Sequence, residues 1–340
     1  MPKTFTSYLI GFLVILALVL VTLLLYVAFD SYRSGNQELF VDSAVGVIAI
    51  IAAVVAGWRA SLLQERLQHD REEARRSASR LEKQRLDERF AEAVQHLSSE
   101  KTETQIGGLL ALDRMLHSTP SVEERWQITQ MVEFYIRRKC LMDSMQDPIP
   151  LPEHVQVAVQ VICKRPLSKE PRPLNLSNLA LCSLRAPSPA NLASADFSGS
   201  DLSNSIIRMA CLTNSNFEDT NLSGAQMDGA DLSKSNLTSA NLTRTRLSSA
   251  RLTQAKLDSA LLTGTDFENA QLEDASLTSS TLSEVAFRSA HLAHVDFSST
   301  ESITRTDFTG ARMAGASMRV TDISNVGLSS RQKAEVDHLP

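Results

Sequence analysis

An apolar residue recurs at every fifth position of the chain from Leu192 to Phe297 without a break, over 22 consecutive positions. Two residues before each of them lies a small or β-branched residue, such as Ala190 or Ala195. A period of five fits neither a helix of 3.6 residues per turn nor a strand that alternates every two residues. The segment therefore predicts a solenoid of short repeats. Solenoids serve mostly as binding surfaces or scaffolds.

The central apolar residues fall into four columns when they are sorted at intervals of 20. Two columns, which begin at Leu192 and Leu202, contain leucine throughout. Phenylalanine occurs only in the other two, as Phe197, Phe217 and Phe297 in one and as Phe267 and Phe287 in the other. This sorting predicts a coil of four pentapeptides, with opposed leucine walls and opposed mixed walls.

The pentapeptide register shifts at both ends of the regular series. After Phe297 it slips by one residue and resumes at Ile303 and Phe308. We expect a one-residue bulge near 299–302, which returns Phe308 to the column of Phe267 and Phe287. Upstream, the segment 186–189 (Ala-Pro-Ser-Pro) interrupts the series and is expected to form an inserted corner.

Two apolar runs lie near the amino terminus. Tyr8–Phe29 has no charged residue, and Leu39–Trp58 has one, Asp42. Each is long enough to cross a bilayer as a helix, which needs ~20 residues. The first run is longer than the apolar region of a typical signal peptide and is followed by no clear cleavage site, so we expect a membrane span. Asp42 is either a functional intramembrane acid or a water-facing residue at the outer end of the second span.

Basic residues favour one orientation of this hairpin. The loop between the runs carries one arginine and two acids, whereas five arginines follow Trp58 within 59–76. Since positive residues stay on the cytoplasmic side, both termini are predicted to be cytoplasmic.

The next region has a helical composition. Residues 59–100 contain no glycine or proline and are rich in strong helix formers. Leu63, Leu67 and Leu81 fit a heptad loosely, while Asp70 and Gln84 interrupt it, so both a coiled-coil homo-oligomer and a solvated spacer helix remain open. Further amphipathic helices are expected in 101–170, where Ser121-x-x-Glu124 is a capping-box pattern.

Several motifs resemble those of a known family. Units such as Asn191-Leu192, Asp201-Leu202 and Asn241-Leu242 match the A-(D/N)-L-x-x pattern of pentapeptide-repeat proteins. The segment Ile106-Gly107-Gly108, with Arg89-Phe90 before it, resembles a helical, HEAT-like block of the bacterial membrane-tethered type. The resemblance implies a right-handed quadrilateral β-helix after two transmembrane helices, and a multi-pass protein of the inner membrane.

The expected organisation has five parts. They are a transmembrane hairpin (1–58), a charged helical stalk (59–100), a small helical module (101–170), the β-helix (171–328) and a tail that caps the last coil (329–340).

Candidate chemistry is sparse. The net charge of −5 is mild, and the four cysteines show no metal-binding or disulfide spacing. No cofactor, metal site or catalytic group is predicted, and His291 and His294 are expected to be solvated. One group of basic residues is a candidate interaction patch for an acidic partner or RNA, or it forms ion pairs between coils with Asp231 and Asp266. This group consists of Arg244, Arg246, Arg251 and Lys256.

Three functions remain open. The first is a membrane-anchored cytoplasmic scaffold that binds a protein not named by the sequence, with no small-molecule substrate. The second follows from the resemblance, because some pentapeptide-repeat proteins mimic DNA and bind topoisomerases. The hairpin and the basic group argue against it and make a nucleic-acid partner improbable. The third is a sensor or transport accessory protein that works through Asp42. An enzyme is not expected.

Overall fold

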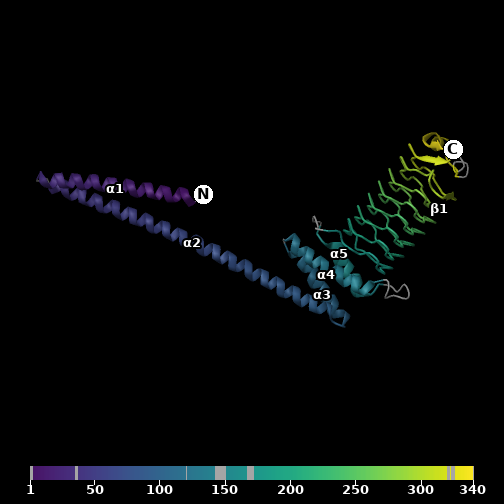
Figure 1. The fold of residues 1–340 in the computed structure, drawn as a ribbon, viewed down its shortest axis with the longest axis horizontal. Helices are drawn as coiled ribbons and strands as arrows, with labels where there is room; N and C mark the ends of the chain where they lie inside the picture. Colours follow the sequence, from purple (N-terminus) through teal and green to yellow (C-terminus); the bar gives the residue numbers. More distant parts are fainter. Residues whose placement is uncertain are drawn as a thin grey trace. The chain divides into compact units, whose positions relative to one another are not determined.

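The computed structural model describes residues 3–34, 37–119, 121–141, 151–166, 172–319, 322 and 326–339. Within them the helices are α1 (Lys3–Arg33), α2 (Gln37–Leu97), α3 (Thr102–Ser118), α4 (Val122–Cys140), α5 (Glu153–Lys164) and α7 (Ser330–Glu335). The strands are β1 (Thr281–Ser283), β2 (Ser302–Thr304), β3 (Ser317–Arg319) and β4 (Asp337–Leu339). Figure 1 shows long helices followed by short helices and then a stack of coils. The predicted boundary near residue 171 and the last residue lie outside the described residues.

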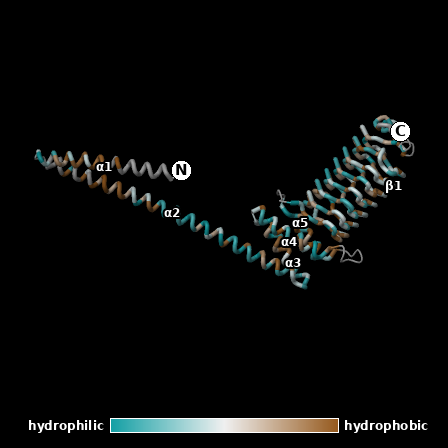
Figure 2. The backbone as a smooth tube through the Cα atoms, viewed as in Figure 1, coloured by the Kyte–Doolittle hydropathy of each residue, from teal (hydrophilic) through white to brown (hydrophobic). Residues whose placement is uncertain are grey.

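The chain divides into two compact units, Met1–Asp87 and Glu88–Pro340. In the first unit, α1 and the first part of α2 pack side by side, because a Cβ on Gly46 would lie 3.7 Å from Leu24 Cδ1. Figure 2 shows the first part of α2 and the described part of α1 as mainly apolar, and the following part of α2 as mainly hydrophilic.

One helix among the described residues is long and apolar enough, by length and composition, to cross a membrane. It belongs to α2 and runs from Ile48 to Leu97. The described side chains of α1 contribute a shorter apolar segment, Leu18–Asp30. The start of the predicted first span, at Tyr8, lies among side chains outside the described ones.

The second unit begins with the end of α2 and three further helices. Ala93 and Leu97 of α2 are buried. A Cβ on Gly108 of α3 would lie only 2.8 Å from the Ala93 carbonyl oxygen, so glycine at this position allows the close approach of α3 and α2. Ser121 caps α4 by accepting a hydrogen bond from Glu124 N at 3.3 Å, as the capping-box pattern indicated.

From Asn175 onward the chain forms coils that are held together by parallel β-bridges. Between Asn191 and Asp296 each bridge joins residues 20 apart, for example Asn191 to Cys211. The central residues are buried and stack in columns: the rings of Phe197 and Phe217 lie 5.1 Å apart and almost parallel. Twenty residues therefore supply one turn, with a bridge at every fifth residue.

Both predicted register shifts are present. Ser276 pairs with Asp296, 20 residues later, whereas Thr281 pairs with Ser302, 21 residues later, so one extra residue lies between Asp296 and Ser302. Phe308 then stacks on Phe287 with ring centroids 5.3 Å apart, in the predicted column. Upstream, Arg185 pairs with Ile206, also 21 residues later, because the segment 186–189 adds one residue.

Helices cover the first coil. The amide of Ala180 donates to the carbonyl oxygen of Cys140 at the end of α4 (2.7 Å), and the amide of Asn191 donates to that of Cys163 in the last turn of α5 (2.9 Å). Backbone groups that a β-helix end would leave unpaired are thus satisfied by carbonyls that the helix ends leave free.

The tail covers the last coil. Strand β4 pairs in parallel with β3. In α7, the Gln332 side-chain nitrogen donates to the carbonyl oxygens of Phe308 (2.5 Å) and Ala311 (3.2 Å). These hydrogen bonds satisfy carbonyl groups near the end of the β-helix.

Candidate functional site

The outward side chains of the β-helix form four rows, because the residue before each central residue bridges to its counterpart in the next coil. Row 1 contains Asn191, Cys211, Asp231, Arg251, Gln271 and His291. Row 2 contains Asp196, Asn216, Asn236, Lys256, Ser276 and Asp296. Row 3 contains Asp201, Asn221, Asn241, Leu261, Thr281 and Ser302. Row 4 contains Ile206, Gln226, Arg246, Asp266, Ala286 and Asp307.

The predicted basic patch is distributed around one coil. Arg246, Arg251 and Lys256 belong to rows 4, 1 and 2, and Arg244 occupies the turn that follows row 3. The structure therefore does not bring the four cations onto one row. The four side chains are all exposed, but they point from different parts of the coil.

Two of these cations form ion pairs between coils. Arg251 lies 3.5 Å from Asp231, which is one of the two predicted pairs. Arg246 pairs with Asp228 at 3.1 Å, whereas Asp266 accepts a hydrogen bond from the Ser248 hydroxyl at 2.8 Å. Pairs this exposed contribute at most ~1 kcal/mol each. Two residues of the basic group therefore pair with acidic side chains of the same domain.

Row 4 and its neighbouring turns form a ladder of alternating charge. Asp228 lies between Arg208 (3.3 Å) and Arg246 (3.1 Å). Arg288 lies between Glu268 (3.3 Å) and Asp307 (3.5 Å). These acids hold the pKa of Arg288 above its ordinary value, with its hydrogen bond to Glu268 as the main cause.

Asparagines stabilise rows 2 and 3 from within. Asn236 Nδ2 donates to Asn216 Oδ1 at 3.0 Å, and Asn241 Nδ2 donates to Asn221 Oδ1 at 3.3 Å. The same oxygens accept backbone amides two residues later, as Asn221 Oδ1 does from Ser223 N at 3.2 Å. These side chains hold the turns and join the coils, so their regular spacing reflects folding.

A metal site is not assembled among the described residues, where no group of three potential ligands occurs. His291 lies on row 1, 3.2 Å from Glu273. His294 lies in the following turn at positive φ.

The buried thiols are held in their protonated form. Burial raises the pKa of Cys140 and of Cys163 to about 12. Since the thiolate is the reactive form, these two cysteines are poor nucleophiles at neutral pH.

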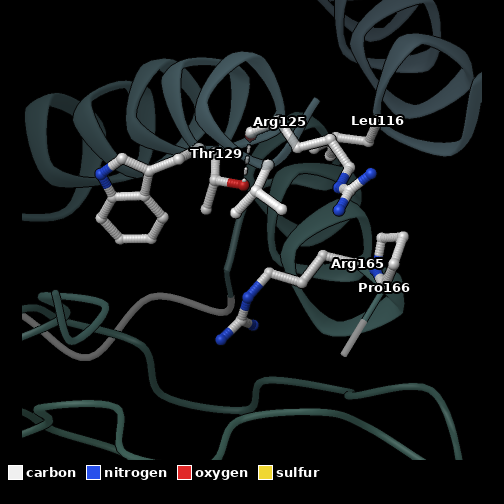
Figure 3. A pocket seen from close by; sticks show the side chains of 7 residues that line it. Leu116, Arg125, Thr129, Arg165 and Pro166 are labelled. Carbon is white, nitrogen blue, oxygen red and sulfur yellow. Dashed lines mark hydrogen bonds between the residues drawn. The ribbon is translucent and has the colours of Figure 1, made fainter. Parts of the chain in front are cut away.

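A small cavity lies in the helical part of the second unit (Figure 3). Its volume of about 10 Å³ has room for roughly one water molecule. Seven residues line it: Leu116, Val122, Arg125, Trp126, Thr129, Arg165 and Pro166. The arginines are engaged, because Arg125 donates to the Thr119 carbonyl oxygen (2.8 Å) and Arg165 donates to that of Asn191 (2.7 Å). The cavity is too small for an organic ligand.

Sequence reasoning missed the side chains that join the helices to the first coil. Arg137 of α4 donates to Asn175 Oδ1 at 2.8 Å and to the Ser177 carbonyl oxygen at 3.1 Å. Gln156 of α5 accepts a hydrogen bond from Arg185 N at 3.1 Å. No local pattern marks these residues, because their partners lie 29 to 40 residues away.

Comparison with known proteins agrees with the coil geometry. The family model for pentapeptide repeats matches residues 190–219, 215–254 and 255–292, with eight copies. Residues 190–292 are a pentapeptide-repeat domain. No curated protein matches the chain significantly.

Solved structures include similar repeat domains. Full-length QnrB1, a plasmid-mediated fluoroquinolone resistance protein, is 15% identical and is matched over 44% of this chain and 86% of that one, with a TM-score of 0.32. HetL, a pentapeptide-repeat protein involved in heterocyst differentiation regulation in the cyanobacterium Nostoc sp. strain PCC 7120, is 23% identical. It is matched over 44% of this chain and 73% of its own, with a TM-score of 0.20. Pentapeptide-repeat domains of this kind are interaction and structural modules.

Proposed function

We propose that the chain is a membrane-anchored scaffold whose pentapeptide-repeat domain presents its rows to a protein partner in the cytoplasm. The observation that carries the proposal is the continuity of α2. This helix begins in the apolar region at Gln37 and ends at Leu97, inside the core of the second unit. Whatever holds the apolar part of α2 therefore also holds the helical module and the repeats.

The anchor is proposed to be a hairpin of α1 and α2. Leu18, Leu23 and Ile48 expose about 60% of their surfaces, as lipid-facing side chains would. Arginines follow Trp58 and are sparse in the loop, which supports cytoplasmic termini. For a bacterial chain with this topology the membrane is the inner one.

The stalk part of α2 supports a spacer role. Nearly all residues from 59 to 87 are exposed, and a helix of this length spans about 45 Å at ~1.5 Å per residue. Its ion pairs, such as Glu72–Arg76 at 3.8 Å, join neighbouring turns of the same helix. In the heptad that includes Leu63 and Leu67, a parallel dimer would place Arg66 opposite Arg71 of the second helix, which disfavours that coiled coil.

The finer geometry of the repeat domain is part of the proposal. Four bridging rows per coil support a quadrilateral cross-section, and Phe297 meets Phe287 and Phe308 of the facing column at 5.9 and 5.5 Å. A right-handed coil is expected from the family resemblance.

The membrane anchor is tested by fractionation of the full chain and of a variant that starts at residue 59. We expect the full chain to resist alkaline extraction from membranes and the shortened chain to be soluble. Retention of the shortened chain in washed membranes would refute the anchor. Protease added outside spheroplasts should leave a carboxyl-terminal tag intact, and its digestion would refute the cytoplasmic orientation.

The scaffold role is tested by proximity labelling from the carboxyl terminus in cells. Partners labelled by the full chain, and lost when three outward residues of one row are replaced by lysine, identify that row as the recruiting surface. The matched control carries the same replacements on another row. Identical labelling from the wild type and all four row variants would argue against recruitment by the repeats.

A further inference from the structure

Row 3 differs from the other rows in charge. From Asn221 to Thr304, the residues directly before and directly after each central residue of row 3 carry no ionisable side chain. They hold asparagine, serine and threonine, with one leucine. Over the same coils the equivalent positions of row 4 hold Asp228, Arg246, Asp266, Glu268, Arg288 and Asp307. Since an uncharged surface loses less hydration energy when it is covered, row 3 is the row best suited to a protein interface.

Leu261 lies in the middle coil of this uncharged stretch. Its side chain is 42% exposed, and it interrupts the ladder in which Asn241 donates to Asn221. Asparagine would fit this position and extend the ladder by one coil. A single exposed leucine is common. Leu261 is a candidate contact residue because it lies at the centre of the uncharged stretch and between turns of opposite charge.

The turns along one edge of row 3 carry opposite charges at equal distances from Leu261. Arg244 lies one coil before it and Glu284 one coil after it, with Gly264 between them. If two copies meet face to face with their coil axes antiparallel, a two-fold axis at Leu261 places Arg244 of each copy opposite Glu284 of the other. A two-fold interface must be self-complementary in this way.

We propose that row 3 docks onto row 3 of a second copy of this chain, with Leu261 at the two-fold axis and reciprocal Arg244–Glu284 contacts. Glu284 already pairs with Arg305 of its own chain at 2.9 Å, but it remains 54% exposed and can accept a second partner. Glu301, whose carboxylate accepts a hydrogen bond from the Thr281 hydroxyl at 3.1 Å, is the charged side chain beside row 3, and the same symmetry brings it towards Asp219 of the second copy. Both are exposed, so salt screens their repulsion.

The area predicts a weak interface. Five coils at ~4.8 Å spacing separate the first and last residues of the uncharged stretch by about 19 Å. Such a patch lies at the low end of specific interfaces, below roughly 1,200 Å². Confinement of two copies to one membrane would raise their effective concentration and favour pairing. This self-association goes beyond the scaffold proposal and leaves rows 1, 2 and 4 for a partner.

Cysteine cross-linking of the full chain in native membranes tests the proposal. The variants carry Cys211→Ser, because the other three native cysteines are buried. We expect Leu261→Cys to give a disulfide-linked dimer, because the two side chains meet at the axis. Lys256→Cys, exposed one pentapeptide earlier on row 2, is the matched control and should give at least ~10-fold less. Equal yields from both positions, or no dimer from Leu261→Cys, would overturn the proposal.

A charge exchange tests the antiparallel register. In the Leu261→Cys background, Arg244→Glu places two glutamates opposite each other at both reciprocal contacts and should lower the dimer yield several-fold. Adding Glu284→Arg should restore it. Both residues sit in turns at positive φ where other coils hold asparagine, serine or glycine, so the fold requires neither charge. This register would be refuted if Arg244→Glu left the yield of disulfide-linked dimer unchanged, or if the double variant did not restore it. Any dimer would then be attributed to the stalk.

Discussion

Replacing Phe287 by leucine should destabilise its coils more than the same change at Phe217. Both side chains are fully buried at central positions, and leucine occupies the equivalent place in neighbouring columns. The lost transfer free energy is therefore similar at the two sites. The difference lies in the aromatic neighbours.

Phe287 contacts three rings, with centroids 5.2 Å from Phe267, 5.3 Å from Phe308 and 5.9 Å from Phe297. Phe217 stacks on Phe197 at 5.1 Å and is followed in its column by Leu237. Each aromatic pair contributes ~0.5–1.5 kcal/mol beyond burial. Two additional pairs make Phe287→Leu costlier than Phe217→Leu by about 1–3 kcal/mol.

Amide hydrogen exchange of the full chain in detergent measures both effects locally. The free energy of opening should fall for amides near each substitution, and it should fall further around Phe287. Because coils contact mainly their neighbours, each loss should fade within a few coils. Equal losses at the two sites, or a larger loss at Phe217, would refute the claim that ring contacts across the core stabilise the last coils.

Three further changes test the ends of the domain. Gln332→Ala removes two hydrogen bonds to carbonyl oxygens of the last coils and should cost ~1–3 kcal/mol, measured as faster exchange confined to those coils; unchanged exchange would argue against the cap. Arg137→Ala removes the donor to Asn175 and should likewise expose the first coil, which limited proteolysis detects as cleavage near residue 175. Glu133→Gln should reduce the pH dependence of thermal unfolding. Burial raises the pKa of Glu133, so its contribution is full below the unfolded pKa and is lost as pH rises through the folded pKa. Melting curves of wild type and variant from about pH 4 to about pH 8 should therefore diverge as pH rises, with the variant the more stable, and parallel curves would contradict this.

The repeat domain was predictable because its information is periodic. A central residue every five positions and a phenylalanine pattern every 20 gave the coil and its columns before any contact was known. The stacking of Phe267 on Phe287 confirms those columns. The extra residue between Asp296 and Ser302 was predictable for the same reason, since an inserted residue shifts the period.

The ends of the domain were only partly predictable. Ser329-x-x-Gln332 is a capping-box pattern that marks a helix, and both of its hydrogen bonds are present. The second role of Gln332, on carbonyls of Phe308 and Ala311, depends on how the tail folds back. The bond from Ala180 to Cys140 likewise joins segments that share no period. Such contacts are set by packing between elements, which a local pattern does not encode.

Outward residues pose a different problem, because the fold constrains their place but not their chemistry. Arg244 and Lys256 look clustered in the sequence, yet each pentapeptide moves to the next row, so neighbours along the chain are dispersed around the coil. Residues 20 or 40 positions apart, such as Arg244 and Glu284, are the ones that share an edge. A binding surface on this domain must therefore be sought along rows. By that criterion the uncharged row centred on Leu261 is a stronger candidate than the basic group.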